Sequence, residues 1–84
     1  MTHHLKIQSE YFEAVRSGAK RFEVRRDNRV PCYAVGDTLI LEEFADCAYT
    51  GRGVTVLVDY IYRGELCRDG YCIMSILLLR EDGV

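Results

Sequence analysis

A regular alternation of apolar and polar side chains over residues 54–62 constrains the fold of this chain more than any other feature. Successive side chains of a β-strand point to opposite faces, so a period of two predicts a strand with one buried face. The chain is therefore expected to be built around a β-sheet. The side chains expected on the buried face are Val54, Val56, Val58, Tyr60 and Tyr62, with Thr55 and Asp59 on the other face.

Four more segments predict strands, namely residues 3–7, 20–26, 38–44 and 71–79. The last is almost continuously apolar, which is typical of a central strand covered on both faces. Residues 10–17 predict a helix, because Ser9 is a suitable N-cap and Gly18 can adopt the left-handed conformation that ends a helix. Residues 27–31, 45–53 and 63–70 are expected to be loops, and residues 80–84 a loose tail.

The 84 residues suffice for one small domain, which we expect to span residues 1–84. Hydrophobic residues make up 49% of the chain and charged residues 29%, which excludes a disordered protein. Five strands in so short a chain bury their apolar faces best by closing into a small barrel. The predicted fold class is mainly β with one or two short helices (α+β), as a five-stranded pseudobarrel.

No apolar run is long enough to cross a membrane, and the N-terminal residues lack the apolar stretch of a signal peptide. We therefore expect a cytoplasmic protein without a membrane partner. No two of the four cysteines have the two-residue spacing of a zinc-binding pair, so we predict no metal and no cofactor. Reduced, structural thiols are expected at Cys32, Cys47, Cys67 and Cys72.

The basic residues are concentrated near the N-terminal end of the chain. Residues 18–29 contain five Lys or Arg against two acids, although the formal net charge of the whole chain is −2. The net charge excludes a wholly basic nucleic-acid binder, whereas the local cluster predicts a basic patch. We expect the strand over residues 20–26 to hold the core with Phe22 and Val24 and to present its charged side chains to a ligand.

Lys20, Glu23 and Arg25 are the leading candidates for a binding pocket. An arginine holds a phosphate or carbonyl through its rigid fork, and an ionised Glu23 between two cations accepts hydrogen bonds from a base or amide. Strict alternation places Lys20 on the Phe22 face, so the strand must curl or bulge for the three to converge. The alternative is an exposed ladder of weak surface ion pairs.

Further cations and tyrosines extend the list of candidate ligand-binding residues. An exposed tyrosine ring stacks on an unpaired base, and Tyr49 is the preferred candidate, with Tyr11 and Tyr33 as alternatives. His3 and His4 are expected to be frayed or surface residues. Glu42 and Glu43 point to opposite faces of a strand and form a poor acid–base pair. Candidate phosphate contacts are Lys6, Arg26, Arg29 and Arg52, for which solvated surface charge is the alternative.

Several short motifs in order carry a family resemblance. Gly18, Lys20, Glu23 and Arg25 match a G-x-K-x-x-E-x-R pattern, which follows the helical segment SEYFEAVRSG and precedes the turn VGD at residues 35–37. This arrangement resembles the ASCH domain of the PUA-like superfamily. More closely, the segments HHLKI, YFEAV, FEVR, VGDTL, YTGR and GYCIMSI resemble an uncharacterised bacterial and phage family within it.

The resemblance implies a five-stranded pseudobarrel whose polar cleft binds RNA, a nucleotide or a modified nucleoside. One branch resembling this motif hydrolyses the acetyl amide of N4-acetylcytidine with the motif lysine and a threonine. Lys20 matches that lysine, but Glu23 stands in place of the threonine. Whether the protein is an enzyme therefore stays open, with Lys20 and Glu23 as catalytic candidates. The alternatives to a binding domain are a small hydrolase, of amidohydrolase or ribonuclease type, and a protein-interaction module.

Overall fold

The computed structural model describes residues 1–83 and confirms the predicted mainly β fold, with five strands and one short helix. No helix in those residues is long and apolar enough to span a bilayer. The elements in chain order are β1 (Thr2–Gln8), α1 (Ser9–Arg16), β2 (Phe22–Arg26), β3 (Thr38–Ala45), β4 (Ala48–Tyr62) and β5 (Tyr71–Asp82).

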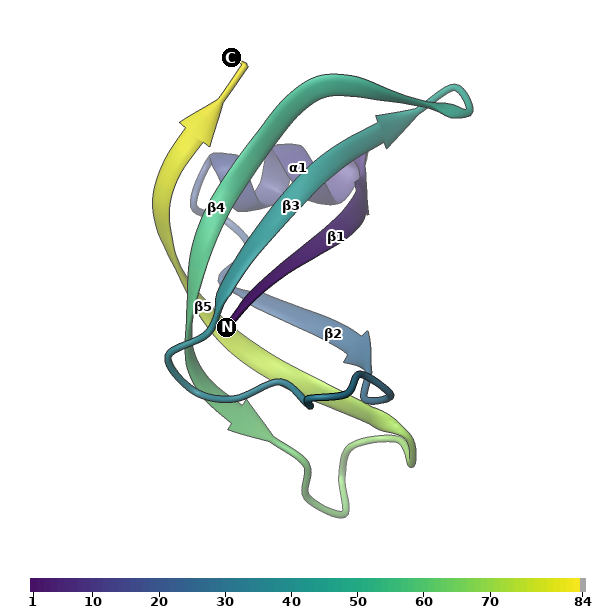
Figure 1. Ribbon diagram of the computed structural model, residues 1–84, viewed down its shortest axis with the longest axis vertical. Coiled ribbons are helices and arrows are strands. Elements are labelled where there is room, and N and C mark those ends of the chain that lie inside the picture. Colours follow the sequence, from purple (N-terminus) through teal and green to yellow (C-terminus); the bar gives the residue numbers. More distant parts are fainter. Residues whose placement is uncertain (84) are drawn as a thin grey trace.

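The five strands form one curled sheet in the order β1-β3-β4-β5-β2 (Figure 1). Strands β1 and β3 are parallel, and the other neighbouring pairs are antiparallel. The sheet is a half-barrel rather than a closed one, because β1 and β2 are its two edges. A seam therefore separates these two strands, which are joined in sequence by α1.

Helix α1 packs against the concave side of the curled sheet, where Phe12 and Val15 are buried. Residues three apart lie on the same side of a helix, so one apolar stripe suffices to dock it. Gly18 follows the helix with φ +85°, the left-handed conformation expected from the sequence. The helix begins at Ser9, with Gln8 in the N-cap position. The core also contains Leu5, Ile7, Tyr33, Leu39, Leu41, Val54, Val56, Val58, Cys72, Met74 and Ile76.

The expectation of a surface position is wrong for His3, which is only 4% exposed. Its Nε2 lies 2.8 Å from Oδ2 of Asp37, and its ring centroid lies 4.7 Å from that of Tyr33. Asp37 also accepts a hydrogen bond from the backbone N–H of Ala34. A buried carboxylate and imidazole satisfy each other here, so the pair anchors β1 to the turn before β3.

The prediction of a loop over residues 45–53 is also wrong. Strand β4 begins at Ala48, and the pair Ala45–Ala48 closes a two-residue hairpin turn. The turn residues Asp46 and Cys47 both have positive φ, of 52° and 63°. This is the conformation of a type I′ turn, whose twist matches that of the flanking strands. The turn is hidden in the sequence because Cys47 stands where such turns prefer glycine.

The early part of β4 also orders the chain after residue 79, where a loose tail was predicted. Strand β5 continues to Asp82, because Gly53, Val54 and Thr55 pair with residues 80–82. Val84, the last residue of that predicted tail, lies outside the described residues. The long β4 thus provides backbone hydrogen-bonding partners for residues 80–82, whose polar side chains do not enter the core.

An irregularity in β4 corrects the predicted positions of Tyr60 and Tyr62. Val58 pairs with Ile76 but Tyr60 pairs with Ser75, so Asp59 is an extra residue. Such a β-bulge shifts the alternation by one residue. Tyr60 is 64% exposed as a result, and Ile61 packs against the core instead.

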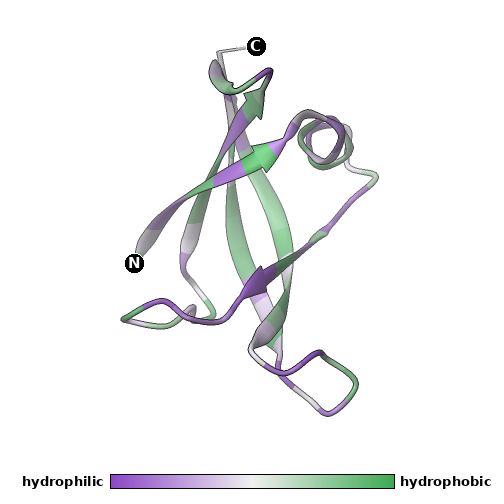
Figure 2. Cartoon of the chain, turned by 90° about the vertical axis from the view of Figure 1, so that its right-hand side faces the viewer, coloured by the Kyte–Doolittle hydropathy of each residue, from purple (hydrophilic) through white to green (hydrophobic). Residues whose placement is uncertain are grey.

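Strand β2 presents the opposite face to the one predicted. Glu23 is 3% exposed, whereas Phe22 and Val24 are 46% and 51% exposed. In Figure 2, strand β2 is largely hydrophilic beside the mostly hydrophobic long strands. Register pairing places exposed and half-buried apolar side chains in rows on the outer side of β2, β4 and β5. We call them the outer patch: Phe22, Val24, Leu57, Tyr60, Tyr62, Ile73 and Leu77.

Candidate functional site

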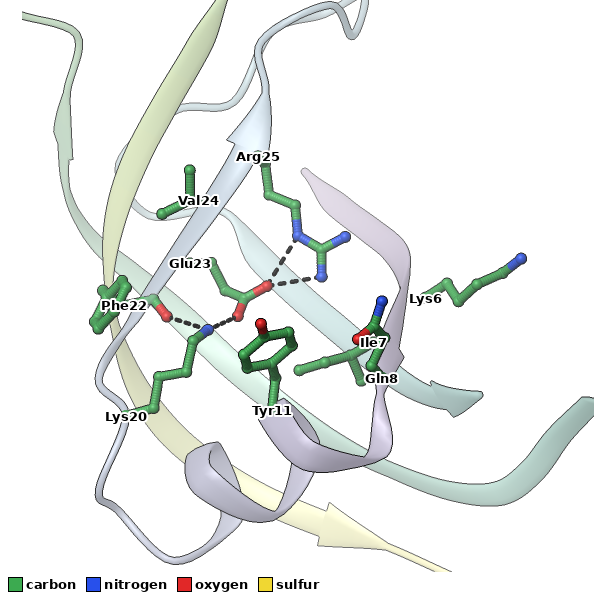
Figure 3. Close-up of a pocket in the computed structure, with 9 residues that line it drawn as sticks. All are labelled: Lys6, Ile7, Gln8, Tyr11, Lys20, Phe22, Glu23, Val24 and Arg25. Atoms are coloured by element: carbon green, nitrogen blue, oxygen red, sulfur yellow. Dashed lines mark hydrogen bonds and ion pairs between the residues drawn. The ribbon is translucent and has the colours of Figure 1, made fainter. Parts of the chain in front are cut away.

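A cavity of about 440 Å³ lies at the seam between the two edge strands of the sheet. Strand β1 forms one wall, β2 the other, and the start of α1 closes one end (Figure 3). A half-barrel leaves a hollow there, because β1 and β2 have no neighbour on their seam side. The lining residues are Lys6, Ile7, Gln8, Tyr11, Lys20, Phe22, Glu23, Val24 and Arg25.

The three leading candidates from the sequence meet in this cavity. Nε of Arg25 donates to Oε1 of Glu23 at 2.9 Å, and Nη2 of Arg25 lies 2.7 Å from the same oxygen. Nζ of Lys20 donates to the other oxygen, Oε2, and also to the carbonyl of Phe22 at 2.7 Å. The Lys20 and Arg25 side chains are 16% and 22% exposed. This arrangement is a built pocket wall and not an exposed ladder.

Lys20 reaches Glu23 because it precedes the strand. Its backbone N–H donates to the carbonyl of Ala14, in the turn that ends α1. Strand β2 begins two residues later, at Phe22. Lys20 is therefore free of the alternation that seemed to place it on the opposite face, and its side chain crosses over to the carboxylate (Figure 3). Lys20 and Arg25 also compensate the cost of burying the Glu23 carboxylate, because a buried carboxylate needs hydrogen-bond donors and opposite charges beside it.

Glu23 serves mainly to hold the two cations in place. A carboxylate offers about four lone-pair positions, and Lys20 and Arg25 occupy three of them. The sequence-based interpretation gave Glu23 the role of ligand acceptor, yet the contacts leave it little capacity for that. Lys6, Lys20 and Arg25 line the cavity against one carboxylate, which gives it a formal charge of +2. The cavity is suited to an anionic ligand.

One ring and one amide complete the cavity wall. Nζ of Lys20 lies 5.5 Å from the ring centroid of Tyr11, and 4.9 Å from that of Phe22, whose ring belongs to the outer patch. Gln8 adds a side-chain amide from the last residue of β1. The sequence offered Tyr11 only as an alternative for stacking and gave no reason to select Gln8. Gln8 and Tyr11 line the cavity because α1 begins directly after β1, which places the junction of these two elements opposite β2.

The remaining predicted ligand contacts do not gather around the trio. Lys6 lines the cavity, with its Nζ 4.1 Å from the ring centroid of Phe44. Arg26 lies over the Tyr71 ring instead. Tyr49 is 59% exposed, makes an edge contact with Phe44, and lines a second hollow together with Arg52. The structure thus brings together three of the seven predicted residues, namely Lys20, Glu23 and Arg25. Lys6 lines the same cavity, but its side chain points away from these three (Figure 3).

Arg52 is occupied by internal ion pairs. Its Nε and Nη2 donate to the two oxygens of Glu43 at 2.7 and 2.8 Å, and Nη2 lies 3.0 Å from Glu13 of α1. Thr50 donates to Glu43 at 2.6 Å. Hydrogen bonds from Arg52 and then Thr50 lower the pKa of Glu43 to about 2. Because this cluster ties the β3–β4 hairpin to the helix, its role is structural.

The cysteines do not contribute to the cavity. All four are free thiols, with Cys32 and Cys47 exposed and Cys67 and Cys72 buried. Burial raises the pKa of the Cys72 thiol, which makes it a poor nucleophile at neutral pH. Within residues 1–83, no three His, Cys, Asp or Glu side chains are grouped so as to hold a metal ion.

Comparison with known proteins places the chain in an uncharacterised family. Residues 2–76 match the family described as a domain of unknown function (DUF3850), and the chain belongs to that family. It is similar to a protein of Escherichia phage P2 described as "Uncharacterized 12.9 kDa protein in GpA 3'region", with 44% identity over 52 residues. These residues are 62% of this chain and 46% of the phage protein, so the chain matches less than half of that relative. The predicted link to an uncharacterised family with a phage relative is confirmed.

Proposed function

We propose that this protein is a binding domain for a nucleotide or for one nucleotide unit of an RNA strand. The observation that carries the proposal is the convergence of Lys20, Glu23 and Arg25 on the wall of the seam cavity. A carboxylate that holds two cations in fixed positions provides a preorganised anion site, which lowers the entropic cost of binding. Arginine binds phosphate through paired hydrogen bonds, and lysine binds it as a point charge.

Cavity size and aromatic content support a nucleotide over a bare anion. A volume of about 440 Å³ lies at the lower end of the range of small-molecule sites, so it fits one nucleotide unit and not a folded RNA. The Tyr11 ring is 46% exposed beside Lys20, and exposed rings stack on bases. The resemblance of the Gly18, Lys20, Glu23 and Arg25 pattern to ASCH domains of the PUA-like superfamily supports the same ligand class. The two exposed thiols suit a reducing, cytoplasmic setting.

The contacts of Lys20 favour binding over hydrolysis. Its Nζ donates to a carboxylate and to a backbone carbonyl, so two of its three N–H donors are engaged within the protein. A lysine that acts as base or nucleophile must instead direct its nitrogen at the reacting atom of the substrate. A small hydrolase would have to break these contacts first, so we rank that alternative below a binding role.

A protein-interaction module is the second candidate, and the outer patch favours it. Val24, Ile73 and Tyr62 lie opposite one another on three neighbouring strands, as do Phe22, Ser75 and Tyr60. Contiguous apolar side chains at a surface are typical of protein–protein contact sites. The patch lies on the convex side of the sheet, opposite Glu23, so both roles are compatible in one molecule.

Substitution of Glu23 by Gln tests the proposed function. Glutamine keeps the side-chain shape but removes the charge that positions Lys20 and Arg25. We expect at least tenfold weaker binding of nucleoside 5′-monophosphates, measured by isothermal titration calorimetry. We also expect a loss of about 1–2 kcal/mol in the free energy of unfolding, because charge-assisted hydrogen bonds are lost.

Glu42→Gln is the matched control, since it makes the same change outside the cavity. The Glu42 carboxylate is 3.5 Å from His4 and its side chain is 45% exposed. Binding should be the same as in the wild-type protein. Equal nucleotide affinity of the wild-type and Glu23→Gln proteins would contradict the assignment of the site.

A further inference from the structure

The unpaired backbone edge of β2 forms part of the cavity wall. Strand β2 ends the sheet and pairs with β5 on one side only. In an antiparallel pair, opposed residues alternate between those that exchange two hydrogen bonds and those that exchange none. Every second residue of an edge strand therefore directs its N–H and C=O away from the sheet.

Two hydrogen bonds at the ends of β2 fix which residues these are. The N–H of Ile76 donates to the carbonyl of Arg21 at 3.0 Å, and the N–H of Asp27 donates to the carbonyl of Gly70 at 2.8 Å. Counting by two from Arg21 to Asp27 assigns Glu23 and Arg25 to the bonded class. Phe22, Val24 and Arg26 then direct their backbone groups into the seam. The carbonyl of Phe22 agrees with this assignment, because Nζ of Lys20 binds it from the seam side.

Val24 contributes its backbone to the cavity and not its side chain. It is a lining residue, yet its isopropyl group is 51% exposed and points away from the cavity in Figure 3. Among residues 1–83, no strand pairs with β2 on the seam side. The N–H and C=O of Val24 therefore offer one donor and one acceptor, side by side, next to the Lys20–Glu23–Arg25 trio.

We propose that the base of the bound nucleotide forms hydrogen bonds, through its Watson–Crick edge, with the N–H and C=O of Val24. This inference rests on the proposed function. Every nucleobase carries an acceptor next to a donor on its Watson–Crick edge, and this pair complements one backbone N–H and C=O. The base thereby lies beside β2 as an added strand would. One face of the base is on the same side of the sheet as the Glu23 and Arg25 side chains. Its phosphate contacts the cavity cations Lys20 and Arg25.

The backbone amide of Val24 allows a direct test by NMR. We expect AMP, CMP, GMP or UMP to shift the Val24 amide proton downfield and to slow its hydrogen exchange by at least tenfold. The amides of Glu23 and Arg25, already bonded to β5, should keep their slow exchange. Ribose 5-phosphate, which carries no base, should shift the signals of Lys20 and Arg25 but leave the Val24 exchange rate unchanged.

A proline at position 24 removes the donor from the edge. Proline is tolerated where the N–H of an edge strand faces away from the sheet. We expect Val24→Pro to weaken binding of the responding monophosphate by about tenfold and to leave ribose 5-phosphate binding unchanged. Arg26→Pro changes the same edge beyond the cavity and should retain most of the base-dependent affinity. Circular dichroism and the amide signals of β5 report whether both variants fold.

The outcomes separate the two levels of the proposal. Nucleotide binding that moves Lys20 and Arg25 but not the Val24 amide would overturn the backbone contact and leave the proposed function standing. Absence of binding by every monophosphate and by ribose 5-phosphate would overturn both. Protection of Val24 and Arg26 together by an extended peptide, without a response to nucleotides, would show that the edge accepts a strand instead of a base.

Discussion

At the scale of single residues, three buried carboxylates determine how the charges of this chain are arranged. Glu23, Asp37 and Glu43 are each under a tenth exposed. The donors to Glu23 are its near neighbours in sequence, whereas Asp37 and Glu43 are also bonded to donors from more distant parts of the chain. Only Glu23 was singled out from the sequence. Surface and buried carboxylates look alike in a sequence, because their partners here lie up to 36 residues away.

Glu43 should make stability depend on pH. Its pKa in the folded protein is lowered from 4.5 to about 2, first by the hydrogen bonds from Arg52. The stabilisation is therefore fully present above about pH 4.5 and is lost as the pH falls toward 2, where the folded state also takes up the proton. We expect Glu43→Gln to flatten the fall in unfolding free energy over that range, measured by urea unfolding at several pH values.

Glu65→Gln is the control for this prediction, because Glu65 is exposed in the loop between β4 and β5. Its pH profile should parallel that of the wild-type protein. If the Glu43→Gln and wild-type profiles are parallel between pH 4.5 and pH 2, the ion pair with Arg52 does not stabilise the fold.

At the scale of secondary structure, the sequence was most informative about which elements exist. The helix and all five strands were predicted, because each carries a clear hydrophobic period. The errors concern faces and ends. Val24 was assigned to the core because alternation identifies two faces but not which one is inside. Tyr60 was misplaced by the bulge at Asp59, which breaks the count of two without any local sequence mark.

The candidate site was predictable to a similar degree. Lys20, Glu23 and Arg25 are close in sequence, so a single strand and its preceding turn bring them together. Gln8 and Tyr11 were not selected, because their proximity to β2 depends on how the sheet curls. Arg52 was expected to contact a ligand, yet Glu43 and Glu13 engage it, and such long-range pairs are not visible in a local pattern.

The hairpin turn between β3 and β4 gives a prediction at this scale. Cys47 has φ 63°, a left-handed conformation that costs a non-glycine residue about 1 kcal/mol or more. We expect Cys47→Gly to raise the unfolding free energy by about 0.5–1 kcal/mol, since Asp-Gly is a preferred type I′ sequence. Ala48→Gly, one residue later in the strand, should lower it by a similar amount. Destabilisation by Cys47→Gly in a thermal unfolding experiment would contradict the turn assignment.

At the scale of the whole molecule, the two faces of the half-barrel differ in chemistry. The concave face holds the helix and the charged cavity, whereas the convex face carries the outer patch. Leu77 lies on this convex face and is 49% exposed. An apolar surface of this kind favours association, and its side chains are not required for the core.

We expect Leu77→Gln to reduce self-association at high protein concentration, measured by multi-angle light scattering. Unfolding free energy should change by less than about 0.5 kcal/mol, because the side chain is half exposed. Leu66→Gln is the control, since Leu66 is 89% exposed in the loop before β5 and lies off the patch. Equal effects of the two substitutions would show that the outer patch is not a specific contact surface.

The open seam also has a kinetic consequence. The cavity is bounded by two strand edges and the helix start, and none of the other elements in residues 1–83 lines it. The proposed nucleotide ligand would thus arrive and depart without waiting for a lid to open. Association should approach the electrostatically assisted encounter rate, and the lifetime of the complex alone should set the affinity. In a titration, resonances of the wall residues should move continuously between free and bound positions.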